Sequence, residues 1–321
     1  MSKGKFSFNK LANSDNFAGY LFIMPWLLGL VLLTVTPLIT SMYISFCSYD
    51  LLGSPEFVGW KNFEWLFFKD TKFWKTMYIT LFYVITAVPL RLVVALLIAM
   101  VLNKKGLNTG FYRTAYYLPS IIGSSVAVAI VWRLLFGSVG IINKVIFNFT
   151  NFAHWISNGA LFAEGALKTD ITLIGMPSTA IWVIVLLYVW EFGSSMLIFL
   201  AGLQNIPDMY YEAALVEGAG FWSRFFFITV PLLSPIILFN LVMQMIRGFL
   251  VFTQVYIITE GGPVDSTLVY AVYMFRRAFE FYDMGAASAM AWIMLIVIGI
   301  ASGLVFFTSK YWVYYESKEG R

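Results

Sequence analysis

The chain has 321 residues, of which 60% are hydrophobic and 12% are charged. This composition lies far from that of soluble proteins and predicts a membrane protein. The net charge of +4 is small for so long a chain, so we expect lysine and arginine to orient the protein in the membrane rather than to bind nucleic acid. One cysteine, Cys47, and one histidine, His154, give neither a disulfide framework nor a metal-binding cluster, so no metal site is predicted.

Apolar runs long enough to cross a membrane occur six times in the sequence. A helix needs about 20 mostly apolar residues to span the hydrocarbon core, where backbone hydrogen bonds must be made internally. We therefore expect an all-α, polytopic membrane protein with six transmembrane helices. The expected spans are Phe17–Phe46, Met77–Leu102, Ala115–Gly137, Thr179–Gly202, Phe225–Phe252 and Gly285–Thr308. The first is longer than a signal-peptide core and lacks a small-residue cleavage site, so we expect it to be retained.

Positive charge is unevenly distributed between the connections. Lysine and arginine are denser in four segments, which are residues 1–16, 103–114, 203–224 and 309–321. Because cytoplasmic segments carry an excess of these residues, we expect both termini in the cytoplasm, as tails of residues 1–16 and 309–321 around a transmembrane domain of residues 17–308.

Two of the connections expected outside have features of their own. The segment from Phe57 to Trp74 mixes aromatic and charged residues, which predicts a helix at the level of the lipid headgroups. The segment from Ser138 to Ser178 is long for a connection, and we expect it to face an external partner.

The connection of residues 203–224 has the signals of a short helix. These signals are Asn205 as a cap, Pro207 at the first helical position, and Gly218 or Gly220 as a stop. Asp208 and Glu212 place acids where the helix dipole favours them. Much of this helix is apolar although it faces water, so we expect it to bind a partner protein.

The same loop resembles a family motif. Glu212-Ala213-Ala214 is followed by Gly218, and Pro231 comes further on. This spacing, with Ile228 also in place, resembles the EAA motif of binding-protein-dependent ABC importer permeases. Glu217 and Val230 depart from the residues usual in that family, aspartate and leucine, and both changes are conservative. An amphipathic connector at the membrane surface is the alternative interpretation.

The resemblance implies that this helix is a coupling helix, which sits in a cleft of a cytosolic ATPase. Glu212 would make polar contact, Ala213 and Ala214 would allow close approach, and Gly218 would form the turn. The ATPase-coupling residues implied are Asp208, Tyr211, Glu212, Ala213, Ala214, Gly218 and Ala219.

The family resemblance also implies partners and a mechanism. They are a second related permease, two cytosolic ATPase subunits and an extracytoplasmic sugar-binding protein, working by alternating access in a bacterial inner membrane. The sequence contains no Gly-x-x-x-x-Gly-Lys phosphate loop, so we expect no cofactor on this chain and ATP with Mg on the ATPase chains.

Further stretches point to sugars. They are Phe57-Val58-Gly59-Trp60-Lys61-Asn62-Phe63, Arg113-Thr114-Ala115-Tyr116-Tyr117-Leu118-Pro119, Gly140-Ile141-Ile142-Asn143, Thr259-Glu260-Gly261-Gly262-Pro263 and Ser266-Thr267. These stretches resemble those of maltose-type carbohydrate permeases, in particular the larger maltose permease subunit. The resemblance implies a sugar or oligosaccharide as the substrate.

Polar residues inside the expected spans are candidates for the substrate pathway, because such groups are costly in lipid and face an interior or a cavity. Asn240, Gln244, Arg247 and Gln254 share one face of the fifth span, with Val251 between them, and Tyr188 and Glu191 lie on the fourth. Packing against the partner permease is the alternative for the fifth-span residues.

Two arginines in the expected spans have no certain partner. Arg247 and Glu191 are candidates for an ion pair with each other, since an unpaired charge in the membrane costs several kcal/mol. We expect Arg91, close to Pro89, near the outer end of its span, with its side chain extended to the interface.

Two other classes of protein were weighed. An ion-coupled secondary carrier would also be polytopic with intramembrane charges, but the sequence shows no clear inverted repeat. A membrane enzyme would need a constellation of reactive side chains, and none is seen, so we predict no catalytic residue.

Overall fold

Helices provide nearly all the regular structure in the computed structural model, which describes residues 15–103, 109–137, 140–142, 144–145 and 173–314. Within these ranges the strands are β1 (Cys47–Ser48) and β2 (Glu56–Phe57), which pair antiparallel. The chain divides into two units. Unit 1 comprises Met1–Lys69 and Arg277–Ile293, and unit 2 comprises Asp70–Arg276 and Met294–Arg321. The prediction of a helical, polytopic membrane protein is confirmed.

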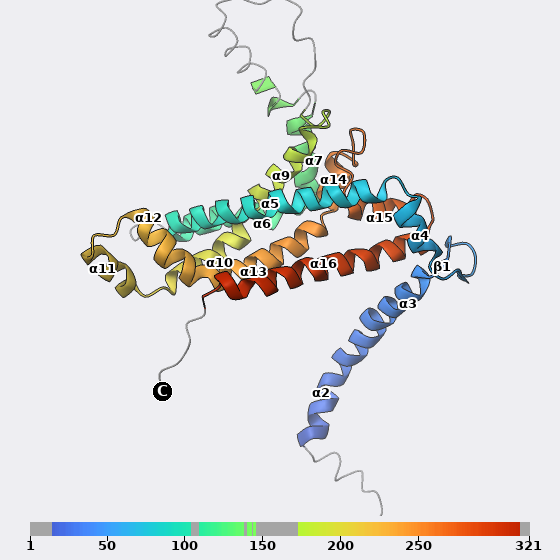
Figure 1. Ribbon diagram of the computed structural model, residues 1–321, viewed down its shortest axis with the longest axis horizontal. Coiled ribbons are helices and arrows are strands. Elements are labelled where there is room, and N and C mark those ends of the chain that lie inside the picture. The colour runs from blue at the N-terminus through green and yellow to red at the C-terminus, as the bar shows by residue number, and fades with distance from the viewer. Residues whose placement is uncertain (1–14, 104–108, 138–139, 143, 146–172, 315–321) are drawn as a thin grey trace, which may run out of the picture. The chain divides into compact units, whose positions relative to one another are not determined.

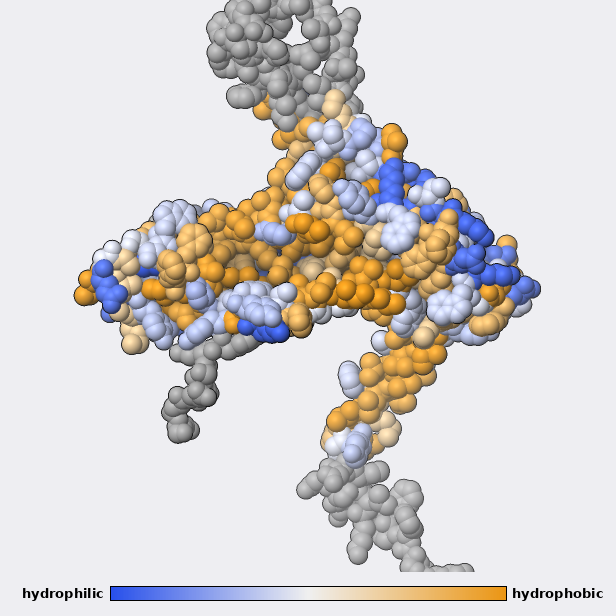
Figure 2. Space-filling model, viewed as in Figure 1, coloured by the Kyte–Doolittle hydropathy of each residue, from blue (hydrophilic) through white to orange (hydrophobic). Residues whose placement is uncertain are grey.

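Unit 1 begins with a long apolar helical segment. It is made of α2 (Asp15–Leu30), η1 (Val31–Val35) and α3 (Thr36–Ser45). Its most apolar stretch has no residue buried in this chain, and Figure 2 shows apolar side chains covering it. A surface of this kind requires lipid or another protein around it.

The rest of unit 1 is tied together by polar contacts. The side-chain amide of Asn62, on α4 (Lys61–Phe68), donates to the carbonyls of Ser45 and Cys47 at 2.9 and 2.8 Å. The backbone N–H of Met284, the first residue of α16 (Met284–Trp312), donates to the carbonyl of Tyr49. The helix α4 lies within the segment predicted to contain a helix.

Both π-helical turns of the described chain end two residues before a proline. η1 precedes Pro37, and η2 (Phe225–Thr229) precedes Pro231. A proline has no N–H, and its ring crowds the carbonyl four residues earlier, so the preceding turn widens. In η2 the N–H of Val230 accordingly bonds to the carbonyl of Phe225, five residues back.

Unit 2 is a helical bundle. Its helices are α5 (Phe73–Leu102), α6 (Thr109–Ile122), α7 (Val126–Phe136), α9 (Ala180–Trp190), α10 (Gly193–Gln204), α11 (Asp208–Val216), α12 (Phe221–Arg224), α13 (Val230–Phe249), α14 (Thr253–Ile258) and most of α15 (Tyr270–Phe279), with the second part of α16. α5 is the longest and packs on α9, α10 and α13 (Figure 1).

Within the part of the chain that the structure describes, four helices are long and apolar enough to cross a membrane, and the number rises to six if each of two bent pairs is one span. The four are Gly19–Ser45, Phe73–Leu102, Phe221–Phe249 and Met284–Trp312. α9 and α10 meet at 43°, and α6 and α7 meet at 91°. The third and fourth expected spans are therefore not straight helices.

The polar face expected along the fifth span is interrupted. α13 ends at Phe249, and Gln254 lies on the separate helix α14, so the expectation of one continuous helical face from Asn240 to Gln254 is wrong. Gly248 in the last turn of α13 lowers the helix propensity there. The segment Ser138–Ser178, expected to face an external partner, lies mostly outside the described residues.

Candidate functional sites

The helix expected in the 203–224 loop is present as α11, and Figure 1 shows it beyond the ends of α5 and α10. Its start differs from the prediction. Asn205 ends α10 instead of capping α11, and Pro207 is the extended residue before the helix, so Asp208 is the first helical residue. The ring of Pro207 fixes its φ at −60°, and its ψ of 132° makes the residue extended.

None of the residues of α11 is buried. Met209, Leu215 and Val216 are exposed to 67%, 54% and 89%. Apolar side chains on a short helix gain nothing from facing water, so this exposure is consistent with a surface that another protein covers. Glu212 and Ala213 are exposed on the same helix, and Ala214 is half-buried.

A left-handed glycine terminates α11. Gly218 has a φ of +79°, and its N–H bonds to the carbonyl of Leu215. The N–H of Ala219 bonds to the carbonyl of Ala214 at 2.8 Å. A side chain at Gly218 would strain this geometry even though no atom stands near its position. The stop predicted at Gly218 is confirmed as local structure.

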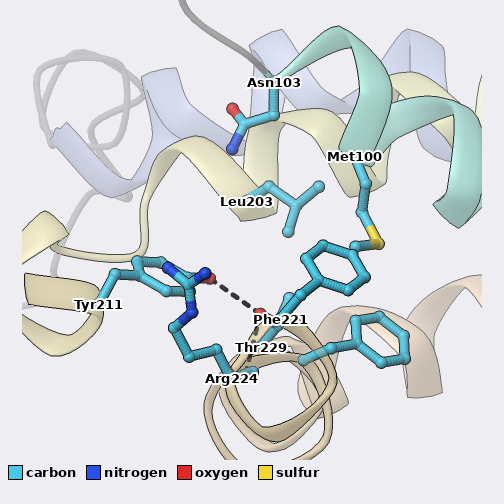
Figure 3. Close-up of a pocket in the computed structure, with 8 residues that line it drawn as sticks. Met100, Asn103, Leu203, Tyr211, Phe221, Arg224 and Thr229 are labelled. Carbon is cyan, nitrogen blue, oxygen red and sulfur yellow. Dashed lines mark hydrogen bonds between the residues drawn. The ribbon is translucent and has the colours of Figure 1, made fainter. Parts of the chain in front are cut away.

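A pocket of about 180 Å³ lies between α11 and the spans (Figure 3). It is lined by Met100, Asn103, Leu203, Tyr211, Phe221, Arg224, Phe225 and Thr229. Across it, the hydroxyl of Tyr211 on α11 and that of Thr229 at the end of η2 lie 3.0 Å apart and form a hydrogen bond. This contact links α11 directly to the segment that leads into α13.

A buried polar cluster lies where α9 bends into α10. The guanidinium of Arg91, on α5, donates from Nη2 to the backbone carbonyl of Glu191 at 2.5 Å, and Nη1 lies 3.8 Å from its carboxylate. The same guanidinium stands 4.4 Å over the ring of Tyr188. The hydroxyl of Tyr188 in turn donates to the backbone carbonyl of Gln244, on α13, at 2.8 Å. Three segments of the bundle are thus joined by polar contacts.

Two expectations about charged residues are wrong. Arg91 does not reach an interface, because it is only 2% exposed and its partner is Glu191. Glu191 therefore pairs with Arg91 and not with Arg247, whose side chain is exposed. The carbonyl left free at the bend offers Arg91 an acceptor inside the bundle, which removes the need to extend to water.

The remaining pathway candidates differ in their surroundings. Gln244 is 2% exposed and accepts a bond from Tyr188 at its side-chain oxygen. Asn240 is fully buried, and neither its oxygen nor its nitrogen has a hydrogen-bond partner among the described residues. Gln254 lies within hydrogen-bonding reach of the Glu191 carboxylate. The structure thus brings Tyr188, Glu191, Gln244 and Gln254 into one region, and the exposed Arg247 is near enough to interact electrostatically with Tyr188 and Glu191.

Sequence reasoning missed Arg91 as a member of this cluster. The signal was its position in the middle of a 30-residue apolar helix, where an arginine requires a buried partner. Among the residues that the structure describes, no group of three or more His, Cys, Asp or Glu side chains could hold a metal ion.

Residues 71–313 match the family described as "Binding-protein-dependent transport system inner membrane component". The chain belongs to this family, so it is a membrane subunit of an ABC importer and a transport protein rather than an enzyme. Membership places it in the inner membrane as a multi-pass protein.

Individual relatives cover nearly the whole chain. It is 51% identical to the "Probable ABC transporter permease protein YesP" of Bacillus subtilis (strain 168), over 95% of this chain and 94% of that protein. It is 30% identical to the "Lactose transport system permease protein LacF" of Rhizobium radiobacter, over 91% of this chain and 94% of that protein.

A solved structure shows the same fold. A chain of the bacterial alginate ABC transporter in complex with an alginate pentasaccharide-bound periplasmic protein aligns with a TM-score of 0.72 and 20% identity, over 92% of this chain and 94% of that one. The resemblance to carbohydrate-uptake ABC permeases is thereby confirmed.

Proposed function

We propose that this chain forms half of the translocation pathway of an ATP-driven sugar or oligosaccharide importer, with a second related permease forming the other half. The names of relatives support a carbohydrate substrate, since one transports lactose and another structure contains an alginate pentasaccharide. Two cytosolic ATPase subunits would bind ATP and Mg and close on each other. An extracytoplasmic binding protein would deliver the sugar, and the pathway would open alternately to the two sides.

The observation that carries this proposal is the exposed apolar helix α11 with its glycine stop. We assign it as the coupling helix in the ATPase cleft, with Glu212 and the small Ala213 at the contact. The 3.0 Å bond between Tyr211 and Thr229 would transmit its displacement to α13. The contact set is Asp208, Tyr211, Glu212, Ala213, Ala214, Gly218 and Ala219.

For the substrate, we assign the pathway to the region around the bend between α9 and α10. Its residues are Tyr188, Glu191, Asn240, Gln244, Arg247 and Gln254. Asn240 supports this assignment, because a buried amide without partners loses about 1 to 3 kcal/mol, which a hydroxyl-rich ligand in an opened state would recover. Packing of the exposed Arg247 on the second permease remains the competing arrangement.

The orientation follows from the same proposal. With α11 on the ATPase side, both termini lie in the cytoplasm, in tails of residues 1–16 and 309–321 around the transmembrane domain of residues 17–308. The connections between the first and second spans and between the fifth and sixth then face outward.

Two glycines in the connection between α11 and α12 give a matched test. Gly218→Ala places a side chain at a φ of +79°, which costs about 1 to 2 kcal/mol, whereas Gly220 has a φ of −71° and open space around it. In the purified complex, Gly218→Ala should lower the ATPase rate stimulated by the loaded binding protein roughly tenfold. Gly220→Ala should leave this rate near that of the unmodified protein.

Equal rates for both variants would contradict the coupling role of α11. Sugar uptake that follows an ion gradient and proceeds without ATP would instead identify a secondary carrier. Copurification of the ATPase with each variant shows whether loss of rate arises from coupling or from assembly.

A further inference from the structure

Unit 1 contains a pocket that none of the roles above uses. Its volume is about 330 Å³, at the lower end of the range for ligand sites. It is lined by Ser48, Tyr49, Asp50, Asn62, Trp65, Phe281, Tyr282, Asp283 and Ala286. Most of these residues come from the connections that follow the first span and precede the last one, and Ala286 lies in the first turn of α16.

The polar lining of this pocket combines acceptor oxygens of Asp50, Asn62 and Asp283 with the indole N–H of Trp65 and with hydroxyls that accept as well as donate, those of Ser48, Tyr49 and Tyr282. The amide nitrogen of Asn62 is already committed to the carbonyls of Ser45 and Cys47, so its oxygen is the atom left for a ligand. Asp50 and Asp283 contribute carboxylates, which accept hydrogen bonds and donate none. A ligand with several donors fits such a lining.

The carboxylates are only partly compensated by positive charge. Asp283 lies 3.9 Å from the guanidinium of Arg277, which is itself held 4.1 Å over the ring of Trp65. Asp50 has no ion pair among the residues that the structure describes. The pocket therefore has an excess of one negative charge.

The geometry around Asp50 keeps this charge in place. The Oδ1 atom of Asp50 accepts the backbone N–H groups of Gly53 and Leu52 at 3.0 and 3.2 Å. These two bonds, the one from Gly53 first, lower the pKa of the Asp50 carboxyl below its ordinary value. They occupy one oxygen, so the second oxygen is available to a ligand.

Aromatic rings complete the pocket walls, and Phe281 and Tyr282 are exposed to 58% and 57%. Acceptors, uncompensated negative charge and aromatic faces together favour a guanidinium or an ammonium group. A metal ion is less well matched, since no group of three or more His, Cys, Asp or Glu side chains occurs in the described residues.

We propose that this pocket receives a basic side chain, an arginine or a lysine, of the extracytoplasmic binding protein. The inference rests on the proposed function, in which these connections face outward. Arginine is favoured at such positions because it forms paired bonds to carboxylates and stacks on aromatic rings, and it is enriched among residues that dominate protein interfaces.

The test uses the complete transporter in lipid nanodiscs and its sugar-loaded binding protein. Asp50→Asn removes the charge and retains an oxygen for the N–H groups of Gly53 and Leu52. We expect it to raise the Kd of the binding protein roughly five- to tenfold and to reduce the dependence of binding on salt. Glu64→Gln is the matched control, because Glu64 is an exposed acid of the same unit, 3.8 Å from Lys69, outside the pocket.

A second variant tests the pocket with every carboxylate present. Ser48 is an exposed pocket residue, so Ser48→Lys places an ammonium beside the carboxylates and should weaken binding as Asp50→Asn does. Ser48→Gln adds similar bulk without charge and should bind normally.

The results of these experiments distinguish a wrong assignment of the pocket from a wrong proposed function. Unchanged Kd values for both Asp50→Asn and Ser48→Lys would overturn the pocket assignment. So would normal Kd values with an altered dependence of uptake on sugar concentration, which would identify a sugar subsite. Failure of the unmodified complex to bind any sugar-loaded protein would instead contradict the proposed function.

Discussion

Arg91 and Glu191 are joined by a hydrogen bond of 2.5 Å from the guanidinium to the backbone carbonyl at the bend between α9 and α10. A bend leaves carbonyls without their helical partners, and inside a membrane such a group has no water to bond. Arg91 satisfies this carbonyl and neutralises the carboxylate of the same residue. The bend and the buried charge pair therefore depend on each other.

Replacing Arg91 should be strongly destabilising. Arg91→Met leaves the carboxylate of Glu191 and its carbonyl buried without a cation, and breaking a buried pair costs about 3 to 5 kcal/mol. We expect a large fall in the thermal unfolding temperature in detergent, partly restored in the double variant Arg91→Met with Glu191→Gln. Arg133→Met is the matched control, since Arg133 pairs with Glu260 at 3.1 Å on the surface.

The surface pair should contribute no more than about 1 kcal/mol, so Arg133→Met should unfold near the temperature of the unmodified protein. If both single variants unfolded at the same temperature, the buried pair would have no special role in stability.

The hydrogen bond between Tyr211 and Thr229 can be isolated by a double-mutant cycle. Tyr211→Phe and Thr229→Val each remove one hydroxyl, and each should reduce the stimulated ATPase rate about two- to tenfold, corresponding to about 0.5 to 1.5 kcal/mol. Because both remove the same bond, the double variant should be no worse than the more impaired single variant. Effects that simply add would show that the two hydroxyls act separately.

Asn240 and Gln244 allow stability to be separated from transport. Replacing the unpartnered, fully buried Asn240 with leucine removes an unsatisfied polar group and should keep or raise thermal stability. If Asn240 contacts sugar in an open state, sugar uptake should nevertheless fall roughly tenfold or more. Gln244→Leu also removes the 3.2 Å contact from Tyr188 to the side-chain oxygen but keeps the 2.8 Å bond to the backbone carbonyl, so it should lose a little stability as well as uptake.

Copurification of both permeases, measured together with uptake, distinguishes sugar contact from packing of these residues against the second permease. Loss of assembly with unchanged sugar dependence among the surviving complexes would place these residues at the interface with the second permease.

Sequence alone was sufficient for the helical class, for α11 and for its end at Gly218, because these depend on local composition and on backbone geometry that few residues tolerate. It was insufficient for Arg91, whose partner lies 100 residues away in the sequence. Periodicity also failed at Phe249, where α13 ends although the polar pattern continues to Gln254. Contacts between distant segments decide both features, and no pattern within one segment contains them.

The lowered pKa of Asp50 leads to a prediction about pH. A depressed pKa means that the carboxylate keeps its charge as pH falls through the ordinary value of about 3.9, and loses it only at lower pH. The effect of Asp50→Asn on the Kd of the binding protein should therefore be the same at about pH 5 as at about pH 7.5. Asp283 faces the same pocket and lies 3.9 Å from the guanidinium of Arg277, so each variant is compared with the unmodified protein at each pH. A difference that vanishes at the lower pH would assign the effect to another group.

The π-helical turn η2 sets the rotational phase between α12 and α13. One extra residue in a helix turns everything beyond it by about 100°, since a turn takes 3.6 residues. Deleting one residue within η2 would therefore rotate α12, with Arg224, by about 100° around the helix axis relative to α13 and change how α12 lies next to α11. The length of this segment thus sets how α12 joins α13, in addition to the hydroxyl contact of Thr229 with Tyr211, so a deletion here should impair coupling more than the loss of that one hydroxyl.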